Sequence, residues 1–257
     1  MWGRYLLDQI EKAEVGGREA IVLFLGGAGI ALKTREAVLY VDPYFGGSPS
    51  PQWLRMIAVP IDPSQISRVD AVLATHEHTD HCHRETVLPM LEAGATFIGP
   101  SSAAAKVREW IRGKTGRIVE VKPGEVVEIK DVRIFTYKAR DLYAESAVTY
   151  VLETPAGAIF HSGDSSYFPG LKAIGEKHKI RAAFLSLGRN LPGRDDYMTP
   201  CDLVRAAMDL GAEILVPIHY DIWKQTQENP RLVEIIANEW RAKVKVHIMR
   251  LGDLLRL

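Results

Sequence analysis

The most informative segment of this chain is Thr75-His76-Glu77-His78-Thr79-Asp80-His81, which contains three histidines and an aspartate within seven residues. It directly follows Val69-Asp70-Ala71-Val72-Leu73-Ala74, a nearly continuous apolar run that is typical of a strand covered on both faces. Residues two apart on an extended segment point the same way, so His76 and His78 can reach one metal ion together. A turn would then present Asp80 and His81 to a neighbouring ion. Such imidazole and carboxylate ligands suit Zn²⁺, Mn²⁺ or Fe²⁺.

Strand-like and helical patterns continue on both sides of this stretch. Runs that predict strands lie at 20–25, 31–34, 37–41, 126–129, 132–137, 148–153, 158–162, 182–187, 213–219 and 244–251. Helical patterns lie at 85–93 and 102–112, between Thr199 and Gly211, and after Pro230. The last of these predicts an apolar stripe made of Leu232, Ile235, Ile236 and Trp240. Two successive strand-rich halves, each followed by helices, predict an α/β fold of two packed sheets with helices outside.

Length and composition favour one globular domain. The chain has 257 residues, and no linker rich in Pro, Gly or Ser divides it. Its hydrophobic fraction of 47% and its charged fraction of 25% are ordinary for a globular protein. We therefore predict a single domain over residues 1–257. Within it, Trp2, Leu6 and Ile10 at helical spacing predict an N-terminal helical segment over 1–16.

Charge and cysteine content exclude several classes of partner. Lys+Arg and Asp+Glu number 32 each, so the chain has no global attraction to nucleic acid or to an anionic membrane. No run reaches the roughly 20 apolar residues of a membrane span, and the N-terminus lacks the pattern of a secretory signal. Cys82 and Cys201 indicate no disulfide framework, which favours a reducing cytoplasm. We expect a small molecule as the partner, and a homo-oligomer is left open.

A glycine-rich motif follows the first predicted strand. Gly26-Gly27-Ala28-Gly29 has some features of a dinucleotide-binding loop. However, the third glycine of that fingerprint, the following helix and the later acidic residue are missing. We therefore interpret the motif as a tight turn between two strands.

The histidine-rich stretch resembles the HxHxDH signature of the metallo-β-lactamase superfamily. Other motifs of that superfamily follow in the same order, namely Leu25-Gly26-Gly27-Ala28-Gly29, Val41-Asp42-Pro43, His161-Ser162-Gly163-Asp164 and Pro217-Ile218-His219-Tyr220. The segments Phe97-Ile98-Gly99-Pro100 and Val121-Lys122-Pro123-Gly124 are similar in sequence to those of the bacterial L-ascorbate-6-phosphate lactonase group. This resemblance implies an αββα four-layer sandwich and a metal-dependent hydrolase.

The resemblance also implies a role for individual residues. The first ion would be held by His76 and His78. The second ion would be held by Asp80, His81 and His219, and Asp164 would bridge the two ions. By itself, an aspartate in a Ser-Gly-Asp turn is commonly a turn residue, and a lone histidine at a strand end is commonly a core or surface residue. The shared order of motifs is what favours a metal site.

One expected ligand is missing. Most of the superfamily supplies another histidine before the bridging aspartate, but no histidine lies between His83 and His161. The lactonase group resembles a variant with an aspartate in this region, which makes Asp141 a candidate ligand; it could equally cap a turn. This change tilts the expected cofactor toward Mn²⁺, with Zn²⁺ as the alternative and one or two ions bound. His161 is expected to contact a ligand rather than to bind a metal.

Three cations are candidates for binding an anionic substrate. Arg189 and Arg194 lie in a polar loop after a predicted core strand, and Lys224 follows the presumed ligand His219. In the lactonase group a similar loop lies beside the active site. These side chains could therefore grip a phosphate, or they could be solvated surface residues.

The resemblance favours hydrolysis of a lactone or a related ester, with Asp80 and Asp164 as catalytic residues. The substrate it suggests is a phosphorylated sugar lactone such as L-ascorbate 6-phosphate. Ser166 and Tyr167 depart from the pattern of the lactonase group, so the substrate pocket can differ. One alternative is a metal-dependent phosphodiesterase. Another is a non-hydrolytic metal-binding or redox module, against which His78 argues because iron-type members carry an acidic residue there.

Overall fold

The computed structural model describes residues 2–113, 116–190 and 194–257. Its first sheet has the strand order β14-β1-β2-β3-β4-β5-β6. These strands are β1 (Ile21–Gly26), β2 (Gly29–Lys33), β3 (Val38–Val41), β4 (Ala71–Leu73), β5 (Thr96–Gly99), β6 (Arg117–Glu120) and β14 (Leu254–Arg256). The turn predicted at the glycine-rich motif joins β1 and β2, which pair antiparallel. From β3 to β6 the strands pair parallel.

The second sheet has the order β13-β12-β11-β10-β9-β8-β7. Its strands are β7 (Val126–Ile129), β8 (Val132–Lys138), β9 (Val148–Thr154), β10 (Gly157–His161), β11 (Ile180–Ser186), β12 (Ile214–Ile218) and β13 (Lys245–Val246). The hairpins β7–β8–β9–β10 are antiparallel, whereas β10, β11 and β12 run parallel. Parallel neighbours need a crossover connection, and helices supply it on the outer face of the sheet.

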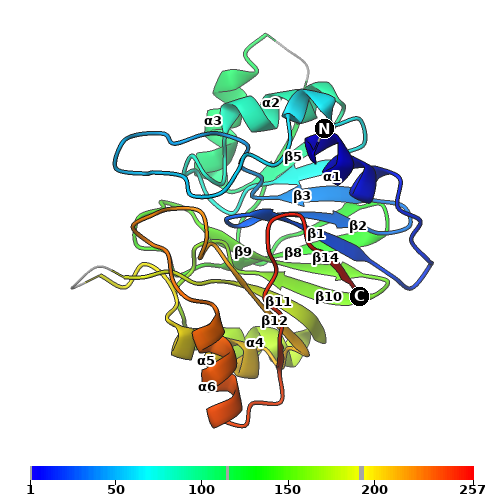
Figure 1. Ribbon diagram of the computed structural model, residues 1–257. Coiled ribbons are helices and arrows are strands. Elements are labelled where there is room, and N and C mark those ends of the chain that lie inside the picture. Colours follow the sequence, from blue (N-terminus) through cyan, green and yellow to red (C-terminus); the bar gives the residue numbers. More distant parts are fainter. Residues whose placement is uncertain (1, 114–115, 191–193) are drawn as a thin grey trace.

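Helices cover the outer face of each sheet (Figure 1). The helices α1 (Trp2–Glu11), α2 (Arg84–Glu92) and α3 (Ser101–Trp110) share a buried cluster with the first sheet. The helices α4 (Gly170–Lys177), α5 (Pro200–Asp209) and α6 (Arg231–Glu239) share another with the second sheet. The 3₁₀ turn η1 (Pro63–Gln65) precedes β4. The predicted αββα four-layer sandwich is therefore confirmed.

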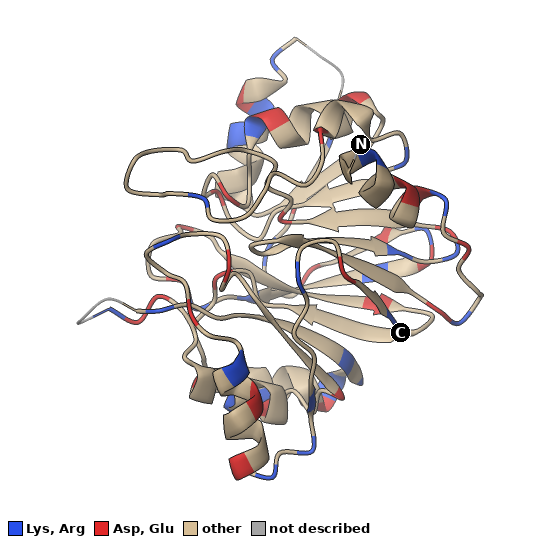
Figure 2. Ribbon diagram, viewed as in Figure 1, with Lys and Arg blue, Asp and Glu red and all other residues tan. Residues whose placement is uncertain are grey.

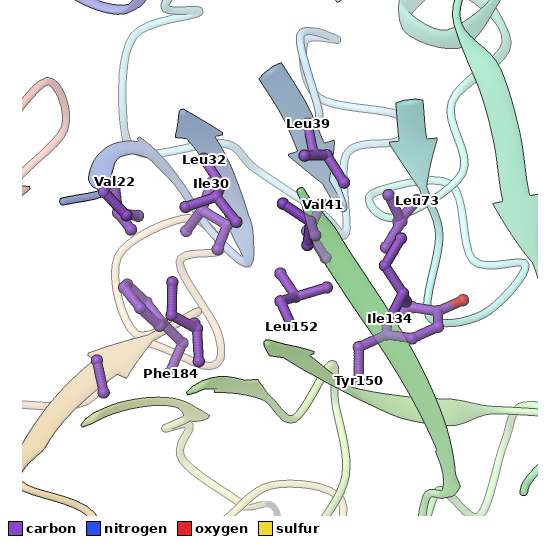
Figure 3. Packing of buried hydrophobic residues seen from close by; sticks show 14 of the residues in the cluster. Val22, Ile30, Leu32, Leu39, Val41, Leu73, Ile134, Tyr150, Leu152 and Phe184 are labelled. Carbon is purple, nitrogen blue, oxygen red and sulfur yellow. The ribbon is translucent and has the colours of Figure 1, made fainter. Parts of the chain in front are cut away.

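The alternation of side chains along the strands creates the layers. In β1, Val22 and Phe24 point between the two sheets, whereas Ile21, Leu23 and Leu25 pack under the helices. Both faces of the strand are buried, which explains its continuous apolar run. Figure 3 shows the layer between the sheets, where side chains of both sheets meet. The labelled ones are Val22, Ile30, Leu32, Leu39, Val41 and Leu73 from the first sheet and Ile134, Tyr150, Leu152 and Phe184 from the second.

Helix α5 begins and ends as its sequence predicts. Thr199 is the N-cap and forms a capping box with Asp202, and Pro200 is the first helical residue. Gly211, with φ +59°, follows the helix in the left-handed region that glycine adopts readily. The helix fixes the entry into β12, whose end carries one of the candidate metal ligands.

Two expectations about the C-terminal region were wrong. The strand expected at 244–251 is limited to β13, and the separate strand β14 pairs antiparallel with β1. Three members of the expected apolar stripe of α6 face solvent, because Leu232, Ile235 and Trp240 are 38%, 51% and 43% exposed, whereas the fourth member, Ile236, is partly buried against the core. Instead, the smaller side chains Val233 and Ala237 pack against the core. Apolar periodicity located the helix but not the face that it buries.

Charges lie on the periphery of the fold. Figure 2 shows residues of both signs spread over the helices and loops, while most of the ribbon of the two sheets carries neither. Among the described residues, no helix has both the length and the apolar character that a membrane crossing requires.

Candidate metal centre

The candidate ligands lie at the ends of strands. Asp42 follows β3, and Thr75 and His76 follow β4, which is parallel to it. In the second sheet, Asp164 follows β10 and His219 follows β12. The carboxyl ends of parallel strands meet at one edge of a sheet, and loops at this edge carry the site. In Figure 1 the long loops after β3 and β12 lie together at the left edge of the sandwich.

The first cluster consists of His76, His78 and Asp141, whose ligand atoms lie within 4.8 Å of one another. His76 Nε2 is 2.9 Å from His78 Nδ1 and 3.9 Å from Asp141 Oδ2. The candidate substitute ligand Asp141 is thus brought to the two histidines. Its carboxylate also accepts the backbone N–H of Tyr143 at 2.8 Å, so the turn-capping interpretation applies to the same side chain.

Hydrogen bonds fix the tautomers in the first cluster. The Thr75 hydroxyl donates its one proton to Asp42 at 2.7 Å, so it accepts the Nδ1–H of His76 at 3.1 Å. The Nε2–H of His78 donates to the Tyr143 carbonyl at 3.2 Å. In neutral rings, the lone pairs of His76 Nε2 and His78 Nδ1 therefore face each other across 2.9 Å. Two acceptors at this distance repel unless they share a cation, which is the arrangement that suits a metal ion.

The second cluster consists of Asp80, His81, Asp164 and His219, whose ligand atoms also lie within 4.8 Å of one another. Asp164 Oδ2 is 3.2 Å from His81 Nε2 and 3.6 Å from His219 Nε2. Asp80 Oδ2 is 3.2 Å from His219 Nε2. Among the described residues, no group hydrogen bonds the buried Nε2 of His81. Two carboxylates and two imidazoles, one of them with this unpaired nitrogen, form a ligand set that fits a divalent ion.

The two clusters adjoin. The ring centroids of His76 and His81 are 4.0 Å apart, so the first and second clusters share a boundary. Asp164 groups with the second cluster, and its charge also acts on His76. The bridging role of Asp164 between two ions stays a prediction.

Asp42 orients residues of both clusters through hydrogen bonds. It is fully buried and accepts the Thr75 N–H and the Thr75 hydroxyl, both at 2.7 Å, and the Nδ1–H of His81 at 2.8 Å. The last contact leaves the Nε2 lone pair of His81 free to face the second cluster. Through Thr75, the same carboxylate sets the tautomer of His76. The backbone of Asp42 has φ +47°, in a region that few non-glycine residues adopt, and His219 has φ +66°.

The glycine-rich turn supports the later ligands. Gly27 N–H donates to the Asp221 carboxylate at 3.0 Å, and the Gly27 carbonyl accepts the His219 N–H at 2.7 Å. Gly27 has φ +61°, and a Cβ there would lie 2.9 Å from the Ile222 side chain. The motif therefore needs glycine for its left-handed backbone and for the close approach of the segment that carries His219.

His161 is buried and lies next to the site without facing the ligand clusters. Its Nδ1 accepts the Gly163 N–H at 3.1 Å, so its Nε2–H donates to the Ala28 carbonyl at 2.8 Å. Both ring nitrogens are thus occupied by backbone groups. The side chain ties the Ser-Gly-Asp turn to the glycine-rich turn, and the turn carries Asp164.

Charges in the second cluster stabilise one another. Burial by itself would raise the pKa values of Asp80 and Asp164, but His81 and His219 outweigh burial and hold both pKa values below the usual range. The same carboxylates overcome the opposing effect of burial and raise the pKa values of His81 and His219. In the first cluster, burial first and the charge of His81 second lower the pKa of His76 to about 3. The second cluster is thus a strongly favourable place for positive charge.

One cavity of about 540 Å³ opens over both clusters. This volume falls in the range of about 300–1,000 Å³ that is common for small-molecule sites. The candidate ligands that line it are His78, Asp80, Asp141 and Asp164. Aromatic side chains from four separate segments complete the wall, namely Trp53, Tyr143, Tyr197 and Trp223.

Two of the three predicted cations line the cavity. Arg189 and Arg194 do so, and Arg194 also pairs with Asp196 at 2.7 Å and lies over the Tyr143 ring at 4.4 Å. Lys224 is exposed and is not among the described residues that line the cavity. Its backbone N–H pairs with the Leu54 carbonyl, which directs this stretch along the neighbouring loop.

Sequence reasoning assigned no role to three residues of the site. Asp42 stood in a quoted motif at a strand end, which is a signal for a carboxylate near the metal. Trp223 closes the motif that contains His219, and its indole N–H donates to Asp80 Oδ2 at 2.8 Å. Tyr197 stacks on His219 with ring centroids 5.1 Å apart, and Asn190 holds its backbone with hydrogen bonds of 2.8 and 2.9 Å. No local pattern indicated Tyr197.

Known proteins share this sequence pattern and architecture. A family model described as a β-lactamase superfamily domain matches residues 38–220. The "Probable L-ascorbate-6-phosphate lactonase UlaG" of Escherichia fergusonii is 32% identical over 287 aligned positions, which cover 94% of this chain and 80% of that protein.

Two solved structures show the same fold. Igni18, a metallo hydrolase from Ignicoccus hospitalis, matches with a TM-score of 0.75 and 18% identity, over 93% of this chain and 98% of that one. CmlA, a diiron β-hydroxylase from Streptomyces venezuelae, matches with a TM-score of 0.73 and 15% identity, over 95% of this chain and 55% of that one.

The family match, the curated relative and the two ligand clusters together define the class. The chain belongs to the metallo-β-lactamase superfamily and is a metal-dependent hydrolase. Within the superfamily it is a relative of the L-ascorbate-6-phosphate lactonases.

Proposed function

We propose that this hydrolase opens a lactone, or cleaves a related ester, of a phosphorylated sugar, and that L-ascorbate 6-phosphate is the first substrate to test. The observation that carries the proposal is that both ligand clusters and two arginines line one cavity. The cavity can therefore place a carbonyl group beside the clusters while an arginine binds an anionic group of the same molecule. Relatives named as probable lactonases support this substrate class.

Seven side chains would hold the metal. The first ion would be bound by His76, His78 and Asp141, and the second by Asp80, His81, Asp164 and His219. We propose Mn²⁺ or Zn²⁺, because oxygen and nitrogen donors are mixed in both clusters. When bound, such a divalent ion acidifies water and polarises a carbonyl oxygen.

The chain's own carboxylates would orient the reacting water molecule. Asp80 and Asp164 both stay ionised, because His81 and His219 keep their pKa values low. Asp80 lines the cavity, so its carboxylate can accept a hydrogen bond from a water molecule there and orient it. Asp164 lines the same cavity from the other sheet. The reacting carbonyl would thus lie between one carboxylate from the loop after β4 and one from the turn after β10.

Arg189 is the stronger candidate for the anionic group. Arg194 is already paired with Asp196 and stacked on Tyr143, whereas no described residue forms an ion pair or hydrogen bond with the side chain of Arg189. A guanidinium can bind two phosphate oxygens at once, which orients the substrate as well as holding it. Each charge-assisted contact contributes about 1.5–3 kcal/mol, which is about tenfold or more in KM.

A substrate panel tests the reaction class. Protein loaded with Mn²⁺ or Zn²⁺ would be assayed against L-ascorbate 6-phosphate, other lactones, phosphodiesters and thioesters. We expect the phosphorylated lactone to give the highest kcat/KM. A preference for a cyclic phosphodiester would replace the lactonase proposal with the phosphodiesterase alternative. A metal-loaded protein that hydrolyses none of them but undergoes reversible iron redox chemistry would support a redox module.

Charge-deletion variants test the anion site. We expect Arg189→Ala to raise KM about tenfold for the phosphorylated lactone and to change it little for the dephosphorylated analogue. Lys224→Ala is the matched control, because it removes an exposed cation that follows the neighbouring strand β12 but lies outside the cavity. Equal effects of the two variants on both substrates would show that Arg189 does not recognise the phosphate.

A further inference from the structure

The indole of Trp223 makes one polar contact, and that contact is to a candidate metal ligand. Its Nε1–H donates to Asp80 Oδ2 at 2.8 Å, and the whole residue is only 2% exposed. The same carboxylate oxygen lies 3.2 Å from His219 Nε2. Trp223 therefore contacts Asp80 on the atom by which this aspartate faces the second cluster.

The position of Trp223 is fixed from several sides. Its ring packs edge-on against Trp53 and at a tilt against Tyr44, both with centroids 5.8 Å apart. The backbone on either side of it pairs with the loop after β3, because Met56 N–H donates to Ile222 at 2.8 Å and Lys224 N–H donates to Leu54 at 3.0 Å. The indole N–H is thus held in one place before any ligand binds.

The chemistry of indole suits this position. Indole nitrogen is a hydrogen-bond donor only, so it cannot compete with Asp80 for a cation or take up a proton from it. An aspartate side chain is free to rotate, and one donor on Oδ2 selects the rotamer that faces His219 and His81. Partners that orient a metal-binding carboxylate change metal affinity by about 10–100-fold when they are removed.

We propose that Trp223 is a positioning residue for Asp80 and that its N–H sets the metal affinity of the second cluster. This inference rests on the metal centre described under the proposed function. The loss of the Trp223 N–H should affect the second cluster and not the first, because Trp223 contacts Asp80 and none of His76, His78 and Asp141.

The test compares metal binding by wild type and Trp223→Phe, which removes the N–H and keeps an aromatic ring. Affinities for Mn²⁺ and Zn²⁺ would be measured by chelator competition, and the visible absorption of bound Co²⁺ would report the geometry of each cluster. In Trp223→Phe we expect the metal affinity of the second cluster to fall by about 10–100-fold and that of the first cluster to stay unchanged. The matched control is Tyr44→Phe, which removes an aromatic donor in the same ring cluster that bonds the Gly47 carbonyl instead of Asp80.

A second replacement guards against a packing defect. Benzothienylalanine at position 223 keeps the two fused rings and replaces only the N–H by sulfur, so it should reproduce the loss seen with Trp223→Phe. Wild-type affinity at both binding steps in this analogue would overturn the proposal, even if Trp223→Phe binds metal poorly. Failure of the wild type to bind any divalent metal would instead refute the metal centre itself, and the proposal with it.

Discussion

Replacing Asp42 by Asn should lower the metal affinity of the site although Asp42 is not itself a candidate metal ligand. The carboxylate accepts three hydrogen bonds, two from Thr75 and one from His81, at 2.7–2.8 Å. Asparagine has the same shape and tolerates the left-handed backbone at this position, where φ is +47°. However, its NH₂ group is a donor. Where that group meets the Nδ1–H of His81, two donors face each other and one interaction is lost.

His81 can relieve this conflict by moving its proton to Nε2. That nitrogen faces Asp164 at 3.2 Å, so the lone pair intended for the metal would be occupied by hydrogen. Loss of such an orienting contact weakens metal binding by about 10–100-fold, which corresponds to about 1.4–2.7 kcal/mol. If the proton of His81 stays on Nδ1 instead, the unpaired buried donor should cost about 1–3 kcal/mol in the free energy of unfolding.

The assay is chelator competition for Zn²⁺ and Mn²⁺, with ¹⁵N NMR of the histidine rings to identify the tautomer of His81. Asp62→Asn is the control, because Asp62 also accepts a backbone N–H and a hydroxyl, both from Ser64, at the start of an exposed 3₁₀ turn. Wild-type metal affinity in Asp42→Asn, with the proton of His81 still on Nδ1, would refute this reasoning.

Three further outcomes follow from the same contacts. We expect Asp164→Ala to lower kcat/KM at least about 100-fold, measured on any substrate found, with little change in Tm. Gly163→Ala should destabilise the fold by about 1–3 kcal/mol more than Gly211→Ala in denaturant unfolding. Both glycines have similar positive φ values, +54° and +59°, but only at Gly163 would a Cβ clash, 2.5 Å from Thr75 Oγ1. For Glu77, burial opposes ionisation, but accepted hydrogen bonds from a serine hydroxyl and a backbone N–H hold its pKa below 4.5. Its contribution to stability is therefore complete above 4.5 and is lost as the pH falls through the folded-state pKa. The Tm difference between wild type and Glu77→Gln should shrink from neutral to acid pH, and a constant difference would contradict the assignment.

Local sequence patterns were sufficient to predict the layers of the fold and most residues of the ligand clusters. The continuous apolar runs of β1 and of the strand before His76 are local patterns, so they could be interpreted without knowing the partners of each strand. The spacing of His76, His78, Asp80 and His81 likewise places all four side chains in one short segment. The sequence could not reveal which face α6 buries, because both of its faces carry apolar side chains.

The residues that orient the ligands and line the cavity are specified by contacts between distant segments, which local patterns do not predict. Asp42 and His81 are 39 residues apart, Asp80 and Trp223 are 143 apart, and Gly27 and Asp221 are 194 apart. Such contacts arise where the ends of neighbouring strands of one sheet, or of strands from the two sheets, meet. No local spacing encodes them. The path of the loops likewise explains why Arg189 and Lys224 differ in their distance from the site. Both residues follow strands that end beside the site, but of the two only Arg189 lines the cavity. Periodicity specifies which residues are buried together, whereas the packing of distant segments specifies which polar atoms meet.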